Sequence, residues 1–172
     1  MTEDQKGLQR ACIEWMVQNK NAFTHATTLT LRPYRTVLNS NGEAILKLTH
    51  IEAKETFRFF MKRLNASLFG NAARRFGTAL YVIPVLEGQG TNKLLHYHCA
   101  IGNVPTGMSV DTLKTYIRTA WLKTPHGNEQ IDVELIESAG WFAYMGKEIG
   151  IKNADVMDWT NVVIPSAPTS LT

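Results

Sequence analysis

Two histidines separated by a single residue, His96 and His98, have the residue type and the spacing of metal ligands. In an extended strand, residues two apart project from the same face, so the two imidazoles would stand side by side. Neutral imidazole nitrogens bind divalent metals, which makes the pair a candidate for part of a metal site. An HxH tripeptide also arises by chance, so it needs further ligands and a reaction to support it.

The third candidate ligand is a carboxylate, Glu87, at the end of the preceding strand. If residues 88–93 form a hairpin loop, Glu87 faces Leu94 and lies diagonal to His96, at about 7–8 Å between Cα atoms. Pro84 can introduce a bulge, which leaves this register open. Two imidazoles and one carboxylate leave positions for water or phosphate oxygens, so we expect Mn²⁺ or Mg²⁺ as the cofactor.

A candidate nucleophile, Tyr144, lies in a predicted helix over residues 138–149, with Lys147 three positions later. Phe142, Met145 and Ile149 are spaced as a buried stripe, and Tyr144 and Lys147 are neighbours off that stripe. A tyrosine that loses its proton can attack phosphorus and form a covalent ester. The ammonium group would stabilise either the phenolate or the phosphate.

Periodicity and end signals predict the elements that position these residues. Helices are expected over residues 3–20, 50–69, 109–123 and 138–149, and strands over 24–34, 78–87, 93–101 and 131–137, with a turn at 39–42, a hairpin connection at 88–92 and a loop at 125–128. In the second helix the apolar positions are Ile51, Phe59, Phe60, Leu64 and Leu68. In the histidine strand, the alternate residues Leu95, Tyr97, Cys99 and Ile101 should face the core. Antiparallel pairing with helices on one face predicts an α+β fold.

The length of 172 residues suits a single domain, 1–172, with the chemistry-bearing part at about 24–150. No apolar run is long enough for a membrane span, and the acidic, polar N-terminus does not resemble a signal peptide. Cys12 and Cys99 are too few for a disulfide framework. We therefore expect an intracellular protein, in the bacterial cytoplasm or, for a eukaryotic virus, in the nucleus.

The net charge of +3 permits nucleic-acid binding without requiring it. Basic residues are nevertheless concentrated in one part of the chain, and three of them recur every four residues, as on one face of a helix. The candidates for DNA contact are Arg32, Arg35, Lys54, Arg58, Lys62, Arg74 and Arg75. The competing interpretation is a solvated helix face.

The order of an acid, then HxH on a strand, then Tyr-x-x-Lys on a later helix resembles the HUH endonucleases, in particular the rolling-circle replication initiators. Residues 27–31 (TTLTL) are similar to the first motif of that family, residues 95–101 (LHYHCAI) to the second and residues 144–148 (YMGKE) to the third. The nine-residue interval from Glu87 to His96 is also similar to that of circovirus-type initiators.

The resemblance implies an RRM-like or ferredoxin-like fold, with a central antiparallel sheet of about five strands whose open face carries the metal. Glu87, His96 and His98 would hold the metal, and Lys147 would position the phosphate. Tyr144 would nick single-stranded or hairpin origin DNA, leaving a 5′-phosphotyrosine and a free 3′-OH, and later rejoin strands. The helicase domain of the family is not in this sequence, so we expect a lone nuclease domain, a part of a longer protein, or an initiator that has a host or separately encoded helicase as its partner. Only one tyrosine is suitably placed, so strand transfer would need a second protomer or a second attack by the same tyrosine. We expect a monomer or a weak homo-oligomer.

The sequence is also compatible with other functions. Single-tyrosine transposases of insertion sequences share the HxH and the late tyrosine, but usually have Gln one turn after it, where this chain has Glu148. Relaxases place the tyrosine before the histidines, which would make Tyr34 the nucleophile. A non-catalytic RRM-like module would show stacked aromatics on its sheet, whereas the histidine strand shows none on that face. A metal-dependent phosphodiesterase without covalent chemistry would not need Tyr144.

The remaining histidines and acids are expected to be peripheral. His25 and His126 are predicted at the surface or in loops, and His50 at the start of a helix. Asp132 and Glu134 share the polar face of their strand, where we expect them to be solvated.

Overall fold

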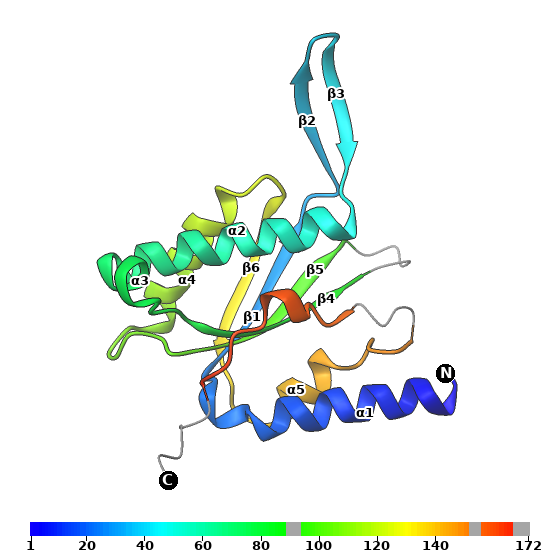
Figure 1. Ribbon diagram of the computed structural model, residues 1–172, viewed down its shortest axis with the longest axis vertical. Helices are drawn as coiled ribbons and strands as arrows, with labels where there is room; N and C mark the ends of the chain where they lie inside the picture. Colours follow the sequence, from blue (N-terminus) through cyan, green and yellow to red (C-terminus); the bar gives the residue numbers. More distant parts are fainter. Residues whose placement is uncertain (89–93, 152–155, 167–172) are drawn as a thin grey trace.

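A four-stranded antiparallel sheet forms the centre of the computed structural model, which describes residues 1–88, 94–151 and 156–166 (Figure 1). Its strands are β1 (His25–Leu31), β4 (Tyr81–Glu87), β5 (His96–Gly102) and β6 (Gly127–Leu135), in the spatial order β4-β5-β1-β6. The longer helices are α1 (Glu3–Gln18), α2 (His50–Phe69) and α4 (Val110–Leu122), and the shorter ones are α3 (Asn71–Phe76), α5 (Gly140–Met145) and the 3₁₀ turns η1 (Lys20–Ala22) and η3 (Trp159–Asn161).

The predicted α+β class is confirmed, with four strands in the central sheet where about five were expected. When β2, β3 and the short α3, which lie outside the central sheet, are left out, the chain from β1 to β6 follows the order β-α-β-β-α-β, in which β5 pairs with both β1 and β4. This is the split βαβ arrangement of ferredoxin-like folds. It places the histidine strand β5 in the middle of the sheet.

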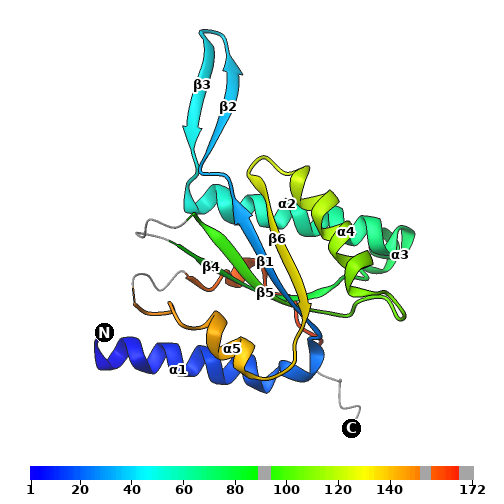
Figure 2. The same cartoon turned by 180° about the vertical axis from the view of Figure 1, so that it is seen from behind.

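Helices cover both faces of the sheet, which corrects the expectation of one covered and one open face. α2 and α4 lie on one side, and α1 and α5 on the other (Figures 1 and 2). The reason is that α1 also has an apolar stripe, including Cys12 and Met16, and this stripe buries against the second face. None of the helices in the described part of the chain has the length and hydrophobicity to cross a membrane.

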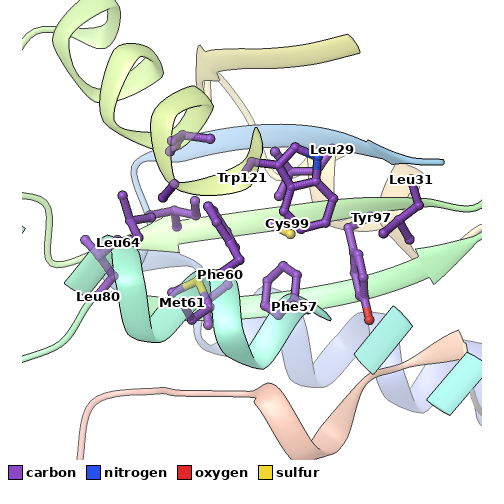
Figure 3. Close-up of a cluster of buried hydrophobic side chains, with 14 of the residues drawn as sticks. Leu29, Leu31, Phe57, Phe60, Met61, Leu64, Leu80, Tyr97, Cys99 and Trp121 are labelled. Atoms are coloured by element: carbon purple, nitrogen blue, oxygen red, sulfur yellow. The ribbon is translucent and has the colours of Figure 1, made fainter. Parts of the chain in front are cut away.

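The larger core lies between the sheet and the α2–α4 layer (Figure 3). Tyr97 and Cys99 of β5 point into it, as predicted, and Trp121 of α4 closes it with an indole N–H that donates to the Thr30 carbonyl at 3.0 Å. Full burial of these large side chains holds β5 rigidly and leaves its alternate residues, His96 and His98, directed to the α1–α5 side.

α2 spans the predicted range, and local sequence explains where it begins. Thr49 and Glu52 form a capping box, in which Thr49 Oγ1 accepts from the Glu52 N–H at 3.2 Å. Of its apolar positions, Phe60 and Leu64 are fully buried and Leu68 packs against the core, whereas Ile51 and Phe59 are 72% and 41% exposed. The buried face also carries Ala53, Phe57 and Met61.

A two-stranded ribbon that the sequence did not predict, β2 (Tyr34–Asn39) and β3 (Gly42–Lys47), extends from the top of the molecule (Figure 1). The predicted turn at 39–42 joins its strands, and Gly42 adopts φ 108°, a conformation that favours glycine. Leu38 and Ile45 are 82% and 74% exposed, so the ribbon contributes little to either core.

Other boundaries also differ from the predictions. β6 begins at Gly127, inside the loop expected at 125–128, because this end of the strand pairs with Leu31 of β1. α5 ends at Met145 rather than Ile149, and at its start the Ser138 hydroxyl accepts from the Gly140 N–H at 3.2 Å. The chain continues from Met145 in turns. The hairpin connection expected at 88–92 lies largely outside the described residues.

Candidate metal centre and tyrosine site

Glu87, His96 and His98 form one compact group in which a ligand atom from each residue lies within 4.8 Å of the others. The strand register explains this arrangement: Glu87 of β4 lies directly opposite His96 of β5, not diagonal to it as expected. The predicted partner, Leu94, precedes the start of β5. Pro84 introduces no bulge, because it lies in an edge strand with its backbone directed outward, where its carbonyl accepts from the Asp158 N–H.

Hydrogen bonds on the far side of each ring aim both histidines at Glu87. His96 Nδ1 lies 2.8 Å from the Leu94 carbonyl, and His98 Nδ1 lies 3.0 Å from Thr28 Oγ1. The two Nε2 atoms then face the carboxylate, at 3.7 Å and 3.4 Å from Glu87 Oε2. Fixing Nδ1 through a neighbouring oxygen and leaving Nε2 for the ion is the usual arrangement of metal-binding histidines.

The residues fit a divalent metal ion. Glu87 and His98 are 1% and 4% exposed, and within the described residues Glu87 Oε1 and His98 Nε2 are buried with no hydrogen-bond partner. Buried polar atoms are normally satisfied, and a positively charged ion bound between these two would satisfy both. The chemistry of two imidazoles and one carboxylate is compatible with a divalent ion.

Within the chain, Glu87 forms an ion pair with Lys147. Its Nζ lies 2.6 Å from Glu87 Oε2. Burial raises the pKa of Glu87, but the surrounding His96, His98 and Lys147 outweigh it and lower this pKa to about 2. Glu87 also raises the pKa of His96, whereas burial lowers that of His98. The carboxylate is therefore ionised and available as a ligand across the physiological pH range.

Tyr144 joins the same site from α5. Its ring centroid lies 5.0 Å from that of His98, and Lys147 Nζ lies 3.7 Å from the centre of the phenol ring. Lys147 comes after the end of α5, yet a bond from its N–H to the Tyr144 carbonyl keeps the two residues on the same side. The structure thus brings together the five predicted residues of the metal and catalytic sets.

α1 holds the tyrosine segment in place. Gln9 Nε2 donates to the carbonyls of Gly146 and Lys147, at 3.1 Å and 2.9 Å. Ile13 packs so closely on Gly146 that a Cβ atom there would overlap it. Phe142, Met145 and Ile149 are buried beneath, as predicted. The first helix, for which the sequence indicated no role in the site, therefore positions Tyr144 and Lys147.

Two further residues at the site were not predicted. Trp141 stacks on Tyr144, with centroids 5.5 Å apart and an interplanar angle of 25°, and its N–H donates to the Cys99 carbonyl. Both aromatic rings border a shallow hollow of about 360 Å³. Thr28 bonds His98 because it faces that residue across β1 and β5. The position of Trp141, one helical turn before Tyr144, could have predicted its place at the site. The role of Thr28 can be deduced only from the strand register.

The structure does not bring the seven predicted DNA-contact residues into this site. Arg35, Arg58 and Lys62 line a separate hollow, and Lys54 does not. Arg32, Arg74 and Arg75 are exposed elsewhere. DNA contact by these residues remains a prediction.

The predictions for the other histidines and acids are right for some residues and wrong for others. His25 and His126 are 5% and 1% exposed, so neither lies at the surface. His25 lies in β1, which contradicts the prediction, whereas His126 lies in the turn before β6, in agreement with the loop position that was expected. His50 begins α2, as expected. Asp132 and Glu134 are exposed, as expected, and neither belongs to the metal group.

Comparison of the chain with protein-family models, with curated proteins and with solved structures gives no match. The functional argument therefore depends on the residues and their geometry.

Proposed function

We propose that the protein is a metal-dependent endonuclease and strand transferase that nicks single-stranded or hairpin DNA through a covalent bond to Tyr144. The proposal rests on one observation: Tyr144 and Lys147 lie next to the group formed by Glu87, His96 and His98. The tyrosine is next to a candidate metal ligand, and an ammonium group lies over its ring. These are the groups that nucleophilic attack on a phosphodiester requires.

In the nicking step, Tyr144 Oη attacks phosphorus and forms a P–Oη bond while the P–O3′ bond breaks. The phenol proton leaves to water, and the departing 3′ oxygen takes up a proton, so the products are a 5′-phosphotyrosine and a free 3′-OH. Attack by a 3′-OH on the phosphotyrosine reverses the sequence and rejoins a strand. Lys147 stabilises the negative charge that builds up on the phenolate or on the phosphate oxygens.

Glu87, His96 and His98 would hold the divalent ion through one carboxylate oxygen and two Nε2 atoms. When bound, the ion supplies Lewis-acid polarisation of a phosphate oxygen. Trp141, which stacks on Tyr144, limits rotation of the phenol ring and offers an aromatic surface to a neighbouring base.

Replication initiation is the biological setting that we favour over transposition. Lys147 supports this choice, because it contacts both Glu87 and Tyr144. Single-tyrosine transposases share the chemistry but usually have Gln at the position of Glu148. In this chain Glu148 Oε2 accepts from the Gly88 N–H at 3.4 Å, next to Glu87.

The test is a denaturing gel with Mn²⁺ and hairpin oligonucleotides taken from the replicon that carries the gene. We expect a slower-migrating protein–DNA adduct that forms with wild type and is lost with Tyr144→Phe. Tyr34→Phe is the matched control, because Tyr34 is 55% exposed on the ribbon and would be the nucleophile of a relaxase. Cleavage that persists in Tyr144→Phe, or an adduct that depends on Tyr34, would overturn the proposal.

A further inference from the structure

A hollow of about 600 Å³ lies along α2, the helix that covers the face of the sheet opposite the metal group. Its walls come from three segments that are distant in sequence: Arg35 in β2, the turns of α2 around Arg58 and Phe59, and Pro125 and His126 just before β6. Nothing in the tyrosine site uses these residues.

Positive charge exceeds negative charge around this hollow. Arg58 and Lys62 lie one helical turn apart on its wall, with Arg35 as a third cation. The carboxylates are only loosely paired: Glu55 lies 3.9 Å from Arg58, and Glu52 lies 3.6 Å from Arg35 while also serving the capping box of α2. Within the described residues, Lys62 has no ion-pair partner. An anionic ligand would find a favourable field here.

An aromatic ring also lines the hollow. Phe59, one of the apolar positions of α2, is 41% exposed and lines the hollow. The Arg63 guanidinium lies 4.8 Å from its ring centre and supports it from the helix surface. Exposed aromatic rings beside cations are the platform on which unpaired bases stack in single-strand binding proteins.

A buried hydrogen-bonding atom completes the wall. His126 Nδ1 lies 3.1 Å from the Arg32 carbonyl, and a carbonyl can only accept, so Nδ1 carries the proton. Nε2 of the neutral ring is then an acceptor, and within the described residues it has no hydrogen-bond partner. Such an atom suits an N–H group on the edge of a base.

We propose that this hollow binds one unpaired nucleotide of single-stranded DNA, with its phosphate at Arg58 and Lys62, its base on Phe59 and a base N–H at His126 Nε2. The choice of DNA rests on the proposed function. Because α2 and Tyr144 lie on opposite faces of the sheet, the hollow anchors the strand away from the phosphate that is cut.

The full chain is titrated against a fluorescent single-stranded oligonucleotide in EDTA, where no cleavage occurs, and the anisotropy is recorded. Arg58→Ala and Lys62→Ala should weaken binding, and each should reduce the slope of log K against log salt by about 0.7. Phe59→Leu should weaken binding about 5-fold or more with no change of slope, because it removes a stacking surface and no charge.

Lys54→Ala is the matched control, since Lys54 occupies the same helix one turn before Arg58 but does not line the hollow. It should lose less affinity than Arg58→Ala or Lys62→Ala does, because Lys54 lies outside the hollow. An oligonucleotide of abasic sites should bind more weakly than the normal strand and be insensitive to Phe59→Leu. Thermal melting checks that each variant folds.

Equal losses in Lys54→Ala and Lys62→Ala would indicate a diffuse basic surface and overturn the site, as would unchanged affinity in Phe59→Leu. A free nucleoside monophosphate that binds as tightly as the strand would overturn its assignment to DNA. The affinities are measured without metal, so they test the hollow even if no Tyr144 adduct forms.

Discussion

At the residue scale, the orientation of His98 depends on a hydroxyl from a neighbouring strand. Thr28 Oγ1 lies 3.0 Å from His98 Nδ1, which leaves Nε2 for the metal. Residues of this kind determine the tautomer and the angle of the ring, and their loss typically costs about 10- to 100-fold in metal affinity.

We therefore predict that Thr28→Val, which keeps the shape and removes the hydroxyl, weakens Mn²⁺ binding by about 10-fold or more in calorimetric titration. Thr30→Val is the control, because its hydroxyl donates to the Gln130 carbonyl and not to a histidine. Equal Mn²⁺ affinity in the two variants would contradict the role of Thr28.

A second residue-scale prediction concerns His25, which is buried in β1 away from the metal group. Burial lowers the pKa of His25 below its ordinary value of 6.5. As the pH falls below about 6.5, the unfolded chain gains a proton at this residue before the folded chain does. The free energy of unfolding should then decrease, by at most about 1.4 kcal/mol per pH unit for one proton.

Urea unfolding at pH 7.0 and pH 5.5 measures this effect. His25→Gln should show a smaller loss of stability between the two pH values than wild type does, since glutamine does not titrate. Other groups titrate equally in both proteins, so the difference between them isolates His25. Identical pH dependence would show that the His25 pKa is not lowered by folding.

At the element scale, the contact between α1 and the end of α5 determines where the tyrosine stands. Gly146 has φ −81° and ψ −2°, which any residue can adopt, so glycine is required there only for space. Gly146→Ala would press on Ile13 and cost about 1–3 kcal/mol of stability.

The double variant Gly146→Ala/Ile13→Ala should lose less stability than the two single changes added together, because the second change makes room for the first. Urea unfolding of all four proteins gives this coupling energy. Additive losses would show that the two helices do not meet closely at this point.

The elements themselves followed well from sequence, because α2, α4 and the β4–β5 pair have strong periodicity and clear ends. That Glu87, His96, His98, Tyr144 and Lys147 lie together could be predicted from residue type, spacing and the family resemblance, whereas their chemistry stays a prediction. The coverage of the second face of the sheet by helices could not be predicted. The apolar stripe on α1 indicates that this helix packs against something, but not which face of the sheet it packs against. Thr28 and the exact partner of Glu87 depend on strand register, which short polar loops do not specify.

At the scale of the whole molecule, residues 156–163 cover the outer edge of the sheet. Val163 bridges to Val82, and Met157 to Val85. Between these bridges, Asp158 is fully buried and accepts hydrogen bonds from Tyr97 at 3.0 Å and from Thr160 and Asn161 at 2.7 Å. The larger core is thereby tied to the far end of the chain.

Tyr97→Phe should lower the free energy of unfolding by about 1–3 kcal/mol, because it removes a donor from a buried carboxylate. Tyr116→Phe, on the exposed side of α4, should change it little. Urea unfolding of both variants compares them directly. A loss in Tyr97→Phe no larger than that in Tyr116→Phe would show that the bond between Tyr97 and Asp158 adds nothing.

The β2–β3 ribbon has a consequence for how this protein can change over evolution. Beyond Arg35 at its base, its side chains are mostly exposed and none belongs to a core cluster. Mutations, deletions and insertions there meet few packing constraints. The tip of the ribbon is thus where sequences can diverge most freely, and where an added peptide or fused domain would least disturb the candidate metal centre.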